Sequence, residues 1–118
     1  YIVHSDDGMD EISPFAKTNV VELKDGKINE FSIDPKDLGI NSDNKENLKG
    51  KNAEYNSKKI IDIYKGTSNE FSQSVALNAA AGLIVAEKEN NFKNAFKKTS
   101  EYLNSGKVFE HLTKLQSK

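Results

Sequence analysis

The sequence predicts an α/β chain with a strand stub, a β-hairpin and about four helices. Three observations lead to this fold class. A short apolar run, Tyr1–Val3, passes directly into an acidic loop; Asp25-Gly26 separates two β-rich runs; and helical spacing with capping residues follows from Asn52 onward. We therefore divide the chain into a strand end with an acidic loop (1–17), a hairpin (18–33), a loop (34–51) and a helical part (52–118).

Length and composition limit the possible functions. The 118 residues are the size of one domain, and 36% hydrophobic with 30% charged residues indicates a globular chain with a modest core. A formal charge of −1 argues against a nucleic-acid binder, which would carry a clear basic excess. All 17 basic residues are lysines, so any anionic ligand must be held by lysine, backbone N–H, a metal, or residues outside this chain rather than by a bidentate arginine of its own.

Several classes of site and location are also excluded or disfavoured. The chain has no cysteine, which excludes disulfides and thiolate metal sites, and its two distant histidines form no structural zinc pattern. No apolar run approaches the roughly 20 residues of a membrane span, and no signal-peptide pattern opens the chain. We expect a cytoplasmic protein. Because the first residue is not Met and lies inside an apolar run, we also expect a fragment of a longer chain.

The first two segments have β character. Ile2-Val3 is expected to be the end of a strand that delivers the acidic loop, in the manner of a parallel strand, with its neighbouring strands missing or on another chain. Thr18–Leu23 and Lys27–Ile33 flank Asp25-Gly26, and Asp-Gly between such runs predicts a hairpin with a type I′ turn. Alternation in the second run predicts one buried face, with Phe31 and Ile33, and one wet face.

A polar stretch connects the hairpin to the helices. Asp34-Pro35 is typical of a helix cap followed by proline at the first helical position, and Gly39 ends the short turn that results. Residues 41–51 are polar and turn-rich. We expect a surface loop there, with one helical turn at Lys45–Leu48.

Four helices are expected after this loop. Asn52 caps a helix over Ala53–Tyr64 that stops at Gly66, and Thr67 with Glu70 fits a capping box for the next helix, from Ser68 to about Lys88. That second helix is apolar nearly all round, which predicts a buried helix. The last two helices are predicted from Asn90 or Asn91 to about 104, and from 107 to about 116.

The residues with chemical potential are concentrated in the acidic loop. Asp6, Asp7, Asp10 and Glu11 place four carboxylates in six positions, in two pairs separated by Gly8. Like charges this close repel unless water, hydrogen-bond donors or a cation offsets the cost. Mg²⁺ takes such oxygen ligands and commonly binds through one or two carboxylates plus substrate phosphates. From the residues alone, the loop is either a solvated acidic turn or a metal site.

The sequence of this loop resembles a segment found in a known protein family. Residues 3–13, V-H-S-D-D-G-M-D-E-I-S, are similar to the V-H-G-x-D-G-L-D-E-I-S segment of anthranilate phosphoribosyltransferases. The resemblance continues in the family's order through Thr18–Ile33, Asp34–Gly39, Leu48–Gly50, Asn52–Glu54 and Leu77–Ala81. It covers nearly the whole chain but corresponds to only about the last third of a family member. It implies the C-terminal portion of the catalytic α/β domain, of the phosphoribosyltransferase and nucleoside-phosphorylase kind.

The resemblance implies a function and a metal. The intact family transfers 5-phosphoribose from phosphoribosyl pyrophosphate to the amino group of anthranilate, releasing pyrophosphate, in tryptophan biosynthesis, and it works as a homodimer. By the same resemblance Asp10 and Glu11 coordinate the Mg²⁺ that accompanies the diphosphate. Such a cation stabilises the negative charge that develops on the leaving pyrophosphate. No other catalytic or substrate-binding residue is assigned.

The remaining polar residues of interest are given structural roles. Asp6 is expected to be a solvated charge, and Asp7 to cap or brace the loop around Gly8. His4 either has a structural role, donating to the loop backbone, or lies near substrate. Asn78, on the apolar helix, must be satisfied internally and is expected to brace loop backbone. His111 is expected on an exposed helix face.

Departures from the family leave other functions open. The glycine-rich G-T-G-G-D loop and the K-H-G-N-R segment of the family are absent, as is its arginine for the anthranilate carboxylate. We therefore expect the chain alone to be inactive. Two alternatives are a pyrimidine nucleoside phosphorylase-like fragment and a non-catalytic helical module that binds a partner through uncovered apolar surface. Exposure of Ile2, Val3 and the Phe71–Val85 segment would favour the module.

Overall fold

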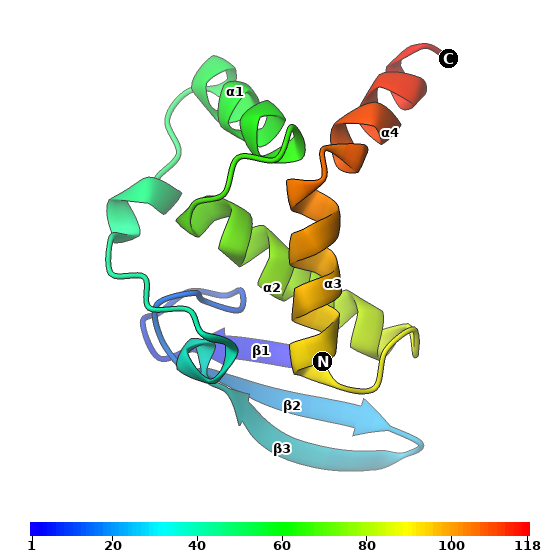
Figure 1. The fold of residues 1–118 in the computed structure, drawn as a ribbon. Helices are drawn as coiled ribbons and strands as arrows, with labels where there is room; N and C mark the ends of the chain where they lie inside the picture. The colour runs from blue at the N-terminus through cyan, green and yellow to red at the C-terminus, as the bar shows by residue number, and fades with distance from the viewer.

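The computed structural model describes residues 1–118, which form one three-stranded sheet and four α-helices (Figure 1). The strands are β1 (Ile2–Ser5), β2 (Thr18–Lys24) and β3 (Lys27–Ile33); the helices are α1 (Ala53–Tyr64), α2 (Glu70–Val85), α3 (Phe92–Asn104) and α4 (Lys107–Gln116); two 3₁₀ turns are η1 (Pro35–Leu38) and η2 (Lys45–Leu48). The sheet lies at one end of the molecule, α2 lies over it, α3 crosses α2, and α1 and α4 lie farthest from the sheet. The predicted α/β class is confirmed.

The sheet is antiparallel throughout, in the order β1-β2-β3. Ile2 is opposite Val21 and Ser5 is opposite Thr18, so β1 pairs with β2 along its whole length. The prediction that the neighbours of the first strand are missing was therefore wrong for one of its edges, and the parallel arrangement was wrong as well. The reason is the acidic loop, which turns the chain back so that β2 runs beside β1 in the opposite direction.

The hairpin between β2 and β3 has the predicted turn. Asp25 and Gly26 have φ values of 51° and 73°, the two positive angles of a type I′ turn. The wet face is confirmed, since Glu30 and Ser32 are exposed. The buried face is shorter than predicted: Ile33 is 7% exposed, but Phe31 is 40% exposed and packs edge-on against the ring of Tyr1.

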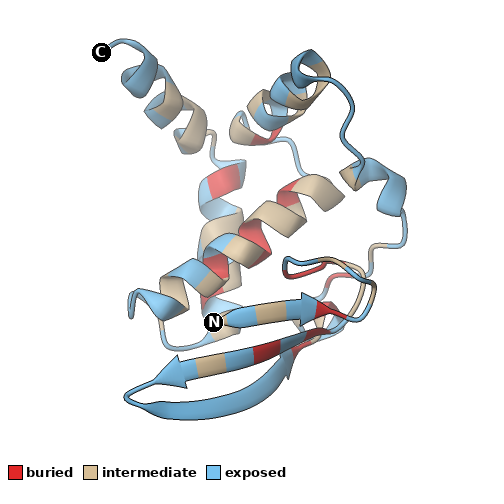
Figure 2. Cartoon of the chain, turned by 180° about the vertical axis from the view of Figure 1, so that it is seen from behind, coloured by how far each residue is buried: buried red, intermediate tan, exposed pale blue.

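The core lies between the sheet, the acidic loop and α2. It consists of Ile12, Val20, Ile33, Ile40 and Leu77, with partly buried side chains from β1, η1 and α3 around it. Figure 2 shows buried positions along β2, in the loop and at intervals along α2. The core is therefore built around the point at which the acidic loop leaves β1, and this fixes the loop against α2.

Helix ends follow local sequence closely, with one exception. α1, α3 and α4 have the predicted bounds, with Asn52 and Asn91 as the caps of α1 and α3. α2 begins later than predicted, because Asn69 and Ser72, rather than Thr67 and Glu70, form its capping box. Thr67 is already used in closing α1, where its N–H donates to the carbonyl of Asp62.

The turn after α1 brings two helix ends into close contact. Gly66 has a φ of 104°, and a β-carbon built on it would lie 2.5 Å from the carbonyl oxygen of Asn104, at the end of α3. No side chain fits in that space without movement of the backbone. Glycine at this position therefore allows the α1–α2 turn to lie directly on the C-terminal end of α3.

α2 is covered on one side only, so the prediction that it is buried all round was wrong. Leu77 and Ala80 are fully buried, but Val85 is 57% exposed. The uncovered side borders an open apolar cavity of about 460 Å³, whose walls include Tyr64, Val75, Ala79, Leu83, Tyr102 and Val108. The 118 residues supply helices for one face of α2 and leave the other partly open.

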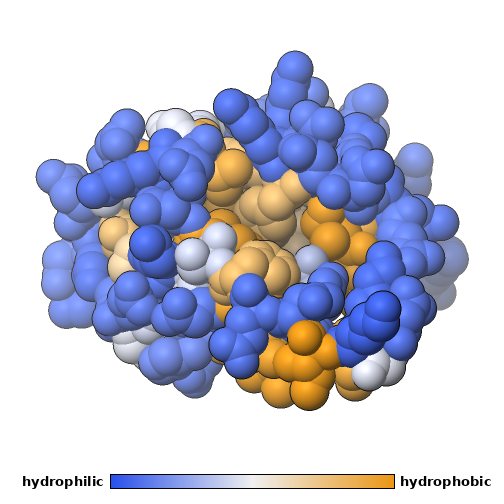
Figure 3. Space-filling model, turned by 90° about the horizontal axis from the view of Figure 1, so that it is seen from below, coloured by the Kyte–Doolittle hydropathy of each residue, from blue (hydrophilic) through white to orange (hydrophobic).

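Apolar side chains are also exposed on the outer face of the sheet. Ile2, Leu23 and Ile28 are 75%, 70% and 70% exposed. Seen from below, apolar side chains gather in the middle of the molecule, surrounded by hydrophilic ones, and again at its lower edge (Figure 3). None of the four helices combines the length and the hydropathy that crossing a membrane would require.

Candidate functional site

The acidic loop is closed at its base by backbone hydrogen bonds. The N–H of Asp6 and the hydroxyl of Ser5 both donate to the carbonyl oxygen of Lys17, at 2.9 and 3.2 Å. A tight turn then follows, in which Ser5 N–H donates to Met9 O at 3.0 Å and Gly8 N–H donates to Ser5 O at 2.9 Å. The loop therefore begins and ends at fixed points of β1 and β2, and its first turn is ordered by its own backbone.

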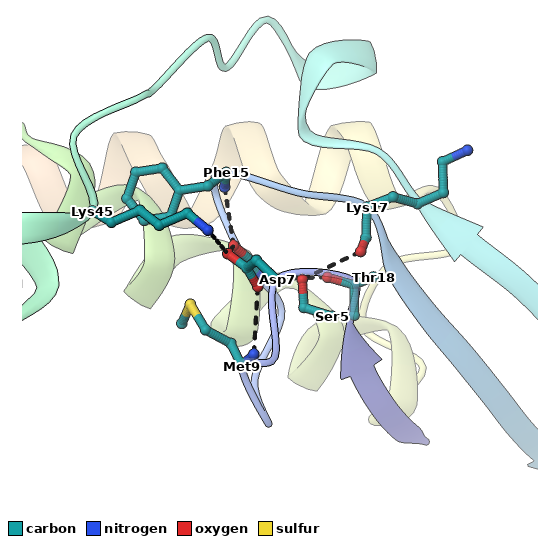
Figure 4. Close-up of polar contacts among 8 residues, drawn as sticks. Ser5, Asp7, Met9, Phe15, Lys17, Thr18 and Lys45 are labelled. Carbon is teal, nitrogen blue, oxygen red and sulfur yellow. Dashed lines mark hydrogen bonds and ion pairs between the residues drawn. The ribbon is translucent and has the colours of Figure 1, made fainter.

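Asp7 points into this turn and is braced there (Figure 4). Its side chain is only 5% exposed, although a carboxylate normally faces water. The carboxylate accepts from the hydroxyl of Ser13 at 2.9 Å and from the N–H of Met9 at 3.4 Å, and its Oδ2 lies 3.3 Å from Nζ of Lys45. The prediction that Asp7 braces the loop around Gly8 is confirmed.

The surroundings of Asp7 favour its charged form. Burial by itself raises the pKa of the Asp7 carboxyl, because a buried charge loses hydration. Hydrogen bonds from the Ser13 hydroxyl, the Met9 N–H and the Lys45 ammonium act in the opposite direction and together outweigh it. The pKa of Asp7 is consequently lowered below its ordinary value of 3.8, and the group is ionised at neutral pH.

The other end of the acidic run is held by α2. Asn78 accepts from the N–H of Ile12 and donates to its carbonyl, both at 3.0 Å, and also donates to Ser74 O at 2.9 Å. Next along the chain, Ser13 N–H donates to the hydroxyl of Thr18 at 3.2 Å. The prediction that Asn78 is satisfied internally and braces loop backbone is confirmed.

Asp10 and Glu11 lie between these two anchors, and both are exposed. Neither takes part in any of the chain's six ion pairs. No group of three or more histidine, cysteine, aspartate or glutamate side chains is arranged to hold a metal ion. Two free adjacent carboxylates fit Mg²⁺, which keeps several waters or phosphate oxygens as its other ligands, better than a metal that needs an all-protein cage.

The other residues singled out from the sequence lie away from this pair. Asp6 is exposed and accepts from the side-chain amide of Asn19 at 2.9 Å, so it is solvated, as predicted, with one added hydrogen bond. His4 is exposed on β1, and its side chain makes no hydrogen bond to the loop backbone. His111 is exposed on α4, as predicted.

Two members of the site were not found from the sequence. Lys45 is one lysine among 17 and lies 38 positions after Asp7, so no local pattern connects the two. Ser13 carried a detectable signal, because a serine before Pro14 can accept from the N–H two residues on, and Phe15 N–H does donate to its hydroxyl at 3.0 Å. That turn places the Ser13 hydroxyl against Asp7.

The chain is similar to several curated proteins. The anthranilate phosphoribosyltransferase of Pelagibacter ubique is 51% identical over 117 residues, which are 99% of this chain and 36% of that protein. The enzyme of the same name from Clostridium beijerinckii is 39% identical over 98% of this chain and 35% of its own length. The chain thus spans about a third of the length of these relatives.

Solved structures show the same fold. The anthranilate phosphoribosyltransferase of Thermus thermophilus matches with a TM-score of 0.83 and 29% identity, over 95% of this chain and 33% of that one. The Saccharomyces cerevisiae enzyme, solved with 4-fluoroanthranilate, matches with a TM-score of 0.82 at 22% identity, which supports the fold alone. A family model described as "Glycosyl transferase family, a/b domain" matches residues 1–109, so the chain belongs to this glycosyl transferase family.

Proposed function

We propose that the chain is the part of an anthranilate phosphoribosyltransferase that supplies the acidic metal loop. The reaction is transfer of 5-phosphoribose from phosphoribosyl pyrophosphate to anthranilate, with release of pyrophosphate. The support is the 51% identity to a relative of that name across 99% of the chain, together with the fold shared with the Thermus thermophilus enzyme. The proposal also includes the homodimer that the resemblance implies and the cytoplasmic location expected from the sequence.

The observation that carries the proposal is the placement of Asp10 and Glu11. Their carboxylates are exposed, adjacent and free of ion pairs, while the residues on either side are fixed by Asp7 and Asn78. Asp10 and Glu11 would hold Mg²⁺, which stabilises negative charge on a leaving diphosphate when it is bound. The role of the two carboxylates would be to hold the ion in position. Because the loop that carries them is already fixed in place, they would need no rearrangement during the reaction.

The remainder of the active site lies outside this chain in the proposal. The chain has no arginine, and the glycine-rich loop and K-H-G-N-R segment of the family are absent from it. The matched relatives have about two-thirds of their length beyond the aligned region. We therefore expect the 118-residue chain alone to form no N-phosphoribosyl anthranilate, whatever the Mg²⁺ concentration.

A chimera tests the function directly. The aligned third of the Pelagibacter ubique enzyme is replaced by this chain, and product formation is measured from phosphoribosyl pyrophosphate and anthranilate at varied Mg²⁺. We expect Mg²⁺-dependent turnover that falls by about 100-fold or more in the Asp10→Asn/Glu11→Gln double variant, since both ligands of the charge-stabilising ion are lost. The matched control is Asp6→Asn, an exposed acid in the same loop, which should leave activity within about twofold.

Two results would reject the proposal. One is a folded chimera, judged by its circular dichroism and cooperative melting, that makes no product. The other is a double variant with unchanged turnover and unchanged Mg²⁺ dependence. Where the chimera does not fold, calorimetric titration of the 118-residue chain with Mg²⁺ and inorganic pyrophosphate replaces it, with the same variants.

A second candidate is a non-catalytic module that binds a partner. The observation in its favour is the exposure of Ile2 and Val85 and the open cavity beside α2. The same chimera separates the two, because a module without a catalytic role would not restore turnover that depends on Asp10 and Glu11. No observation favours a pyrimidine nucleoside phosphorylase, and the curated relatives named above are all anthranilate phosphoribosyltransferases.

A further inference from the structure

The contact between Asp7 and Lys45 joins two segments that are remote in sequence. Asp7 lies in the loop after β1, and Lys45 opens η2, which lies in the polar stretch between the sheet and α1. The Asp7 side chain is 5% exposed, whereas that of Lys45 is 58% exposed. One partner is therefore fixed inside the loop, and the other reaches it from the surface (Figure 4).

This ion pair differs from the three pairs that form within single helical turns. Lys49 and Glu46, Lys58 and Glu54, and Lys97 and Glu101 pair within one helical turn, and every one of these side chains is more than half exposed. Such surface pairs contribute little to stability. Asp7 is a buried carboxylate, for which the loss of a charged partner leaves a poorly compensated charge. Lys45 is the only cation that contacts it.

The Asp7–Lys45 pair also helps to hold the loop segment that carries Asp10 and Glu11. Asp7 connects through the Ser13 hydroxyl to the segment that follows Glu11, and Asn78 holds the intervening Ile12 to α2. Asp10 and Glu11 thus lie between two fixed points. The first is Asp7, which pairs with Lys45, and the second is Ile12, whose backbone is held by Asn78 of α2. The ammonium of Lys45 also cancels the charge of Asp7, so a cation approaching the loop meets the carboxylates of Asp10 and Glu11, the solvated Asp6 and one neutralised pair.

We infer that Asp7 and Lys45 are positioning residues, which hold the loop so that Asp10 and Glu11 bind a divalent cation carrying a diphosphate, while Asp7 itself is not a ligand. The inference rests on the function proposed above. It assigns a role to Lys45, a residue on an otherwise exposed turn, and it separates the four carboxylates into two ligands, one brace and one solvated charge.

The test measures binding on the 118-residue chain rather than turnover. The chain is titrated calorimetrically with Mg²⁺ in the presence of inorganic pyrophosphate, as wild type and as Asp7→Asn, Lys45→Met and Lys45→Arg. We expect Asp7→Asn and Lys45→Met to weaken binding by about tenfold each, the scale for groups that support metal ligands, and Lys45→Arg to restore it. The double variant Asp7→Asn/Lys45→Met should be no weaker than either single variant, because both remove one interaction.

Lys49→Met is the matched control. It removes the same charge from the residue that follows η2, where Lys49 pairs with Glu46 and not with the loop, so binding should stay near the wild-type value. A second readout needs no ligand: amide hydrogen exchange at Met9 and Ser13, whose N–H groups donate to Asp7 and to Thr18, should quicken in Lys45→Met and not in Lys49→Met. The exchange result also shows whether a loss of binding comes from the loop or from global unfolding.

The outcomes separate this inference from the proposed function. Wild-type chain that binds, loses binding in Asp10→Asn/Glu11→Gln, and keeps it in Asp7→Asn and Lys45→Met overturns the positioning role alone. Equal weakening by Lys45→Met and Lys49→Met also overturns it, because net charge would then be the cause. Wild-type chain that does not bind at all overturns the metal role of Asp10 and Glu11, and the positioning role with it.

Discussion

Asn78 makes a two-point contact with the backbone of Ile12, accepting from its N–H and donating to its carbonyl, each at 3.0 Å. This is the pattern by which one strand residue pairs with another, here supplied by a side chain on α2. Ile12 is 1% exposed, so its backbone groups have no access to water. The residue after the two candidate metal ligands is therefore fixed in direction as well as in position.

Replacing Asn78 by leucine should destabilise the chain markedly. Leucine has a similar volume, but it leaves the N–H and the carbonyl of Ile12 buried without partners, and each such group costs about 1–3 kcal/mol. We expect a loss of roughly 2–5 kcal/mol in the free energy of unfolding, measured by urea denaturation. Asn90→Ala, at an exposed position whose side chain makes no hydrogen bond, should change it by less than about 0.5 kcal/mol. Equal effects of the two substitutions would contradict the role of Asn78.

The buried carboxylate of Asp7 should make stability depend on pH in acid. Because its pKa is lower in the folded chain than the ordinary 3.8, the stabilisation is complete above that value and is lost as the pH falls through the lower folded pKa. Asp7→Asn should remove this part of the acid dependence and lower stability at neutral pH. Thermal melting between pH 2 and pH 7 measures both effects. Melting curves of wild type and variant that remain parallel over this range would show that Asp7 is not involved.

Alanine substitutions at two glycines should distinguish the cost of backbone strain from the cost of a steric clash. Gly26→Ala, in the hairpin turn, meets no atom within 4 Å and should cost only the roughly 1–2 kcal/mol of a left-handed conformation. Gly66→Ala carries the same conformational cost and also forces a β-carbon against the carbonyl of Asn104, which should add about 1–3 kcal/mol. Chemical denaturation of the two variants gives the difference. A Gly66→Ala variant as stable as Gly26→Ala would show that α3 moves away without cost.

The start of α2 can be tested by removing its cap. Asn69→Ala removes the side-chain oxygen that accepts from the N–H of Ser72 and should cost about 1 kcal/mol, whereas Thr67→Ala should be nearly neutral. Thr67 contributes only its backbone N–H at the end of α1, and alanine retains that group. Unfolding free energies of the two variants decide between the caps, and a larger loss for Thr67→Ala would restore the capping box predicted from the sequence.

Local chemistry was sufficient for most of the elements. Asp25-Gly26 determines a type I′ turn from backbone sterics alone, and Asn52 and Asn91 cap their helices through hydrogen bonds within three residues. α2 shows where this reasoning fails: Thr67-Ser68-Asn69-Glu70 offers more than one possible cap, and the choice depends on how the chain leaves α1. The same limit applies to β1, whose antiparallel pairing depends on the path of the whole loop.

The candidate site likewise contains contacts that could be predicted from the sequence and contacts that could not. The inward role of Asp7 and the brace by Asn78 were predictable, because a carboxylate beside a glycine and an amide on an apolar helix each require partners. Lys45 was not predictable, because the sequence does not indicate which of many lysines a loop meets after folding. Exposure of α2 was missed for a related reason: apolar composition shows that a helix tends to be covered, and it does not show that the covering residues are present in this chain.

The outer face of the sheet has a practical consequence for the isolated polypeptide. Ile2 is paired with Val21, and Leu23 with Ile28, so these side chains form an exposed apolar patch across the outer face of the sheet. β1 is also an edge strand, with one side unpaired. A net charge of −1 gives neighbouring molecules little mutual repulsion. The apparent mass from light scattering should therefore rise with protein concentration near neutral pH, and charged replacements at Ile2 and Leu23 should hold it at the monomer value.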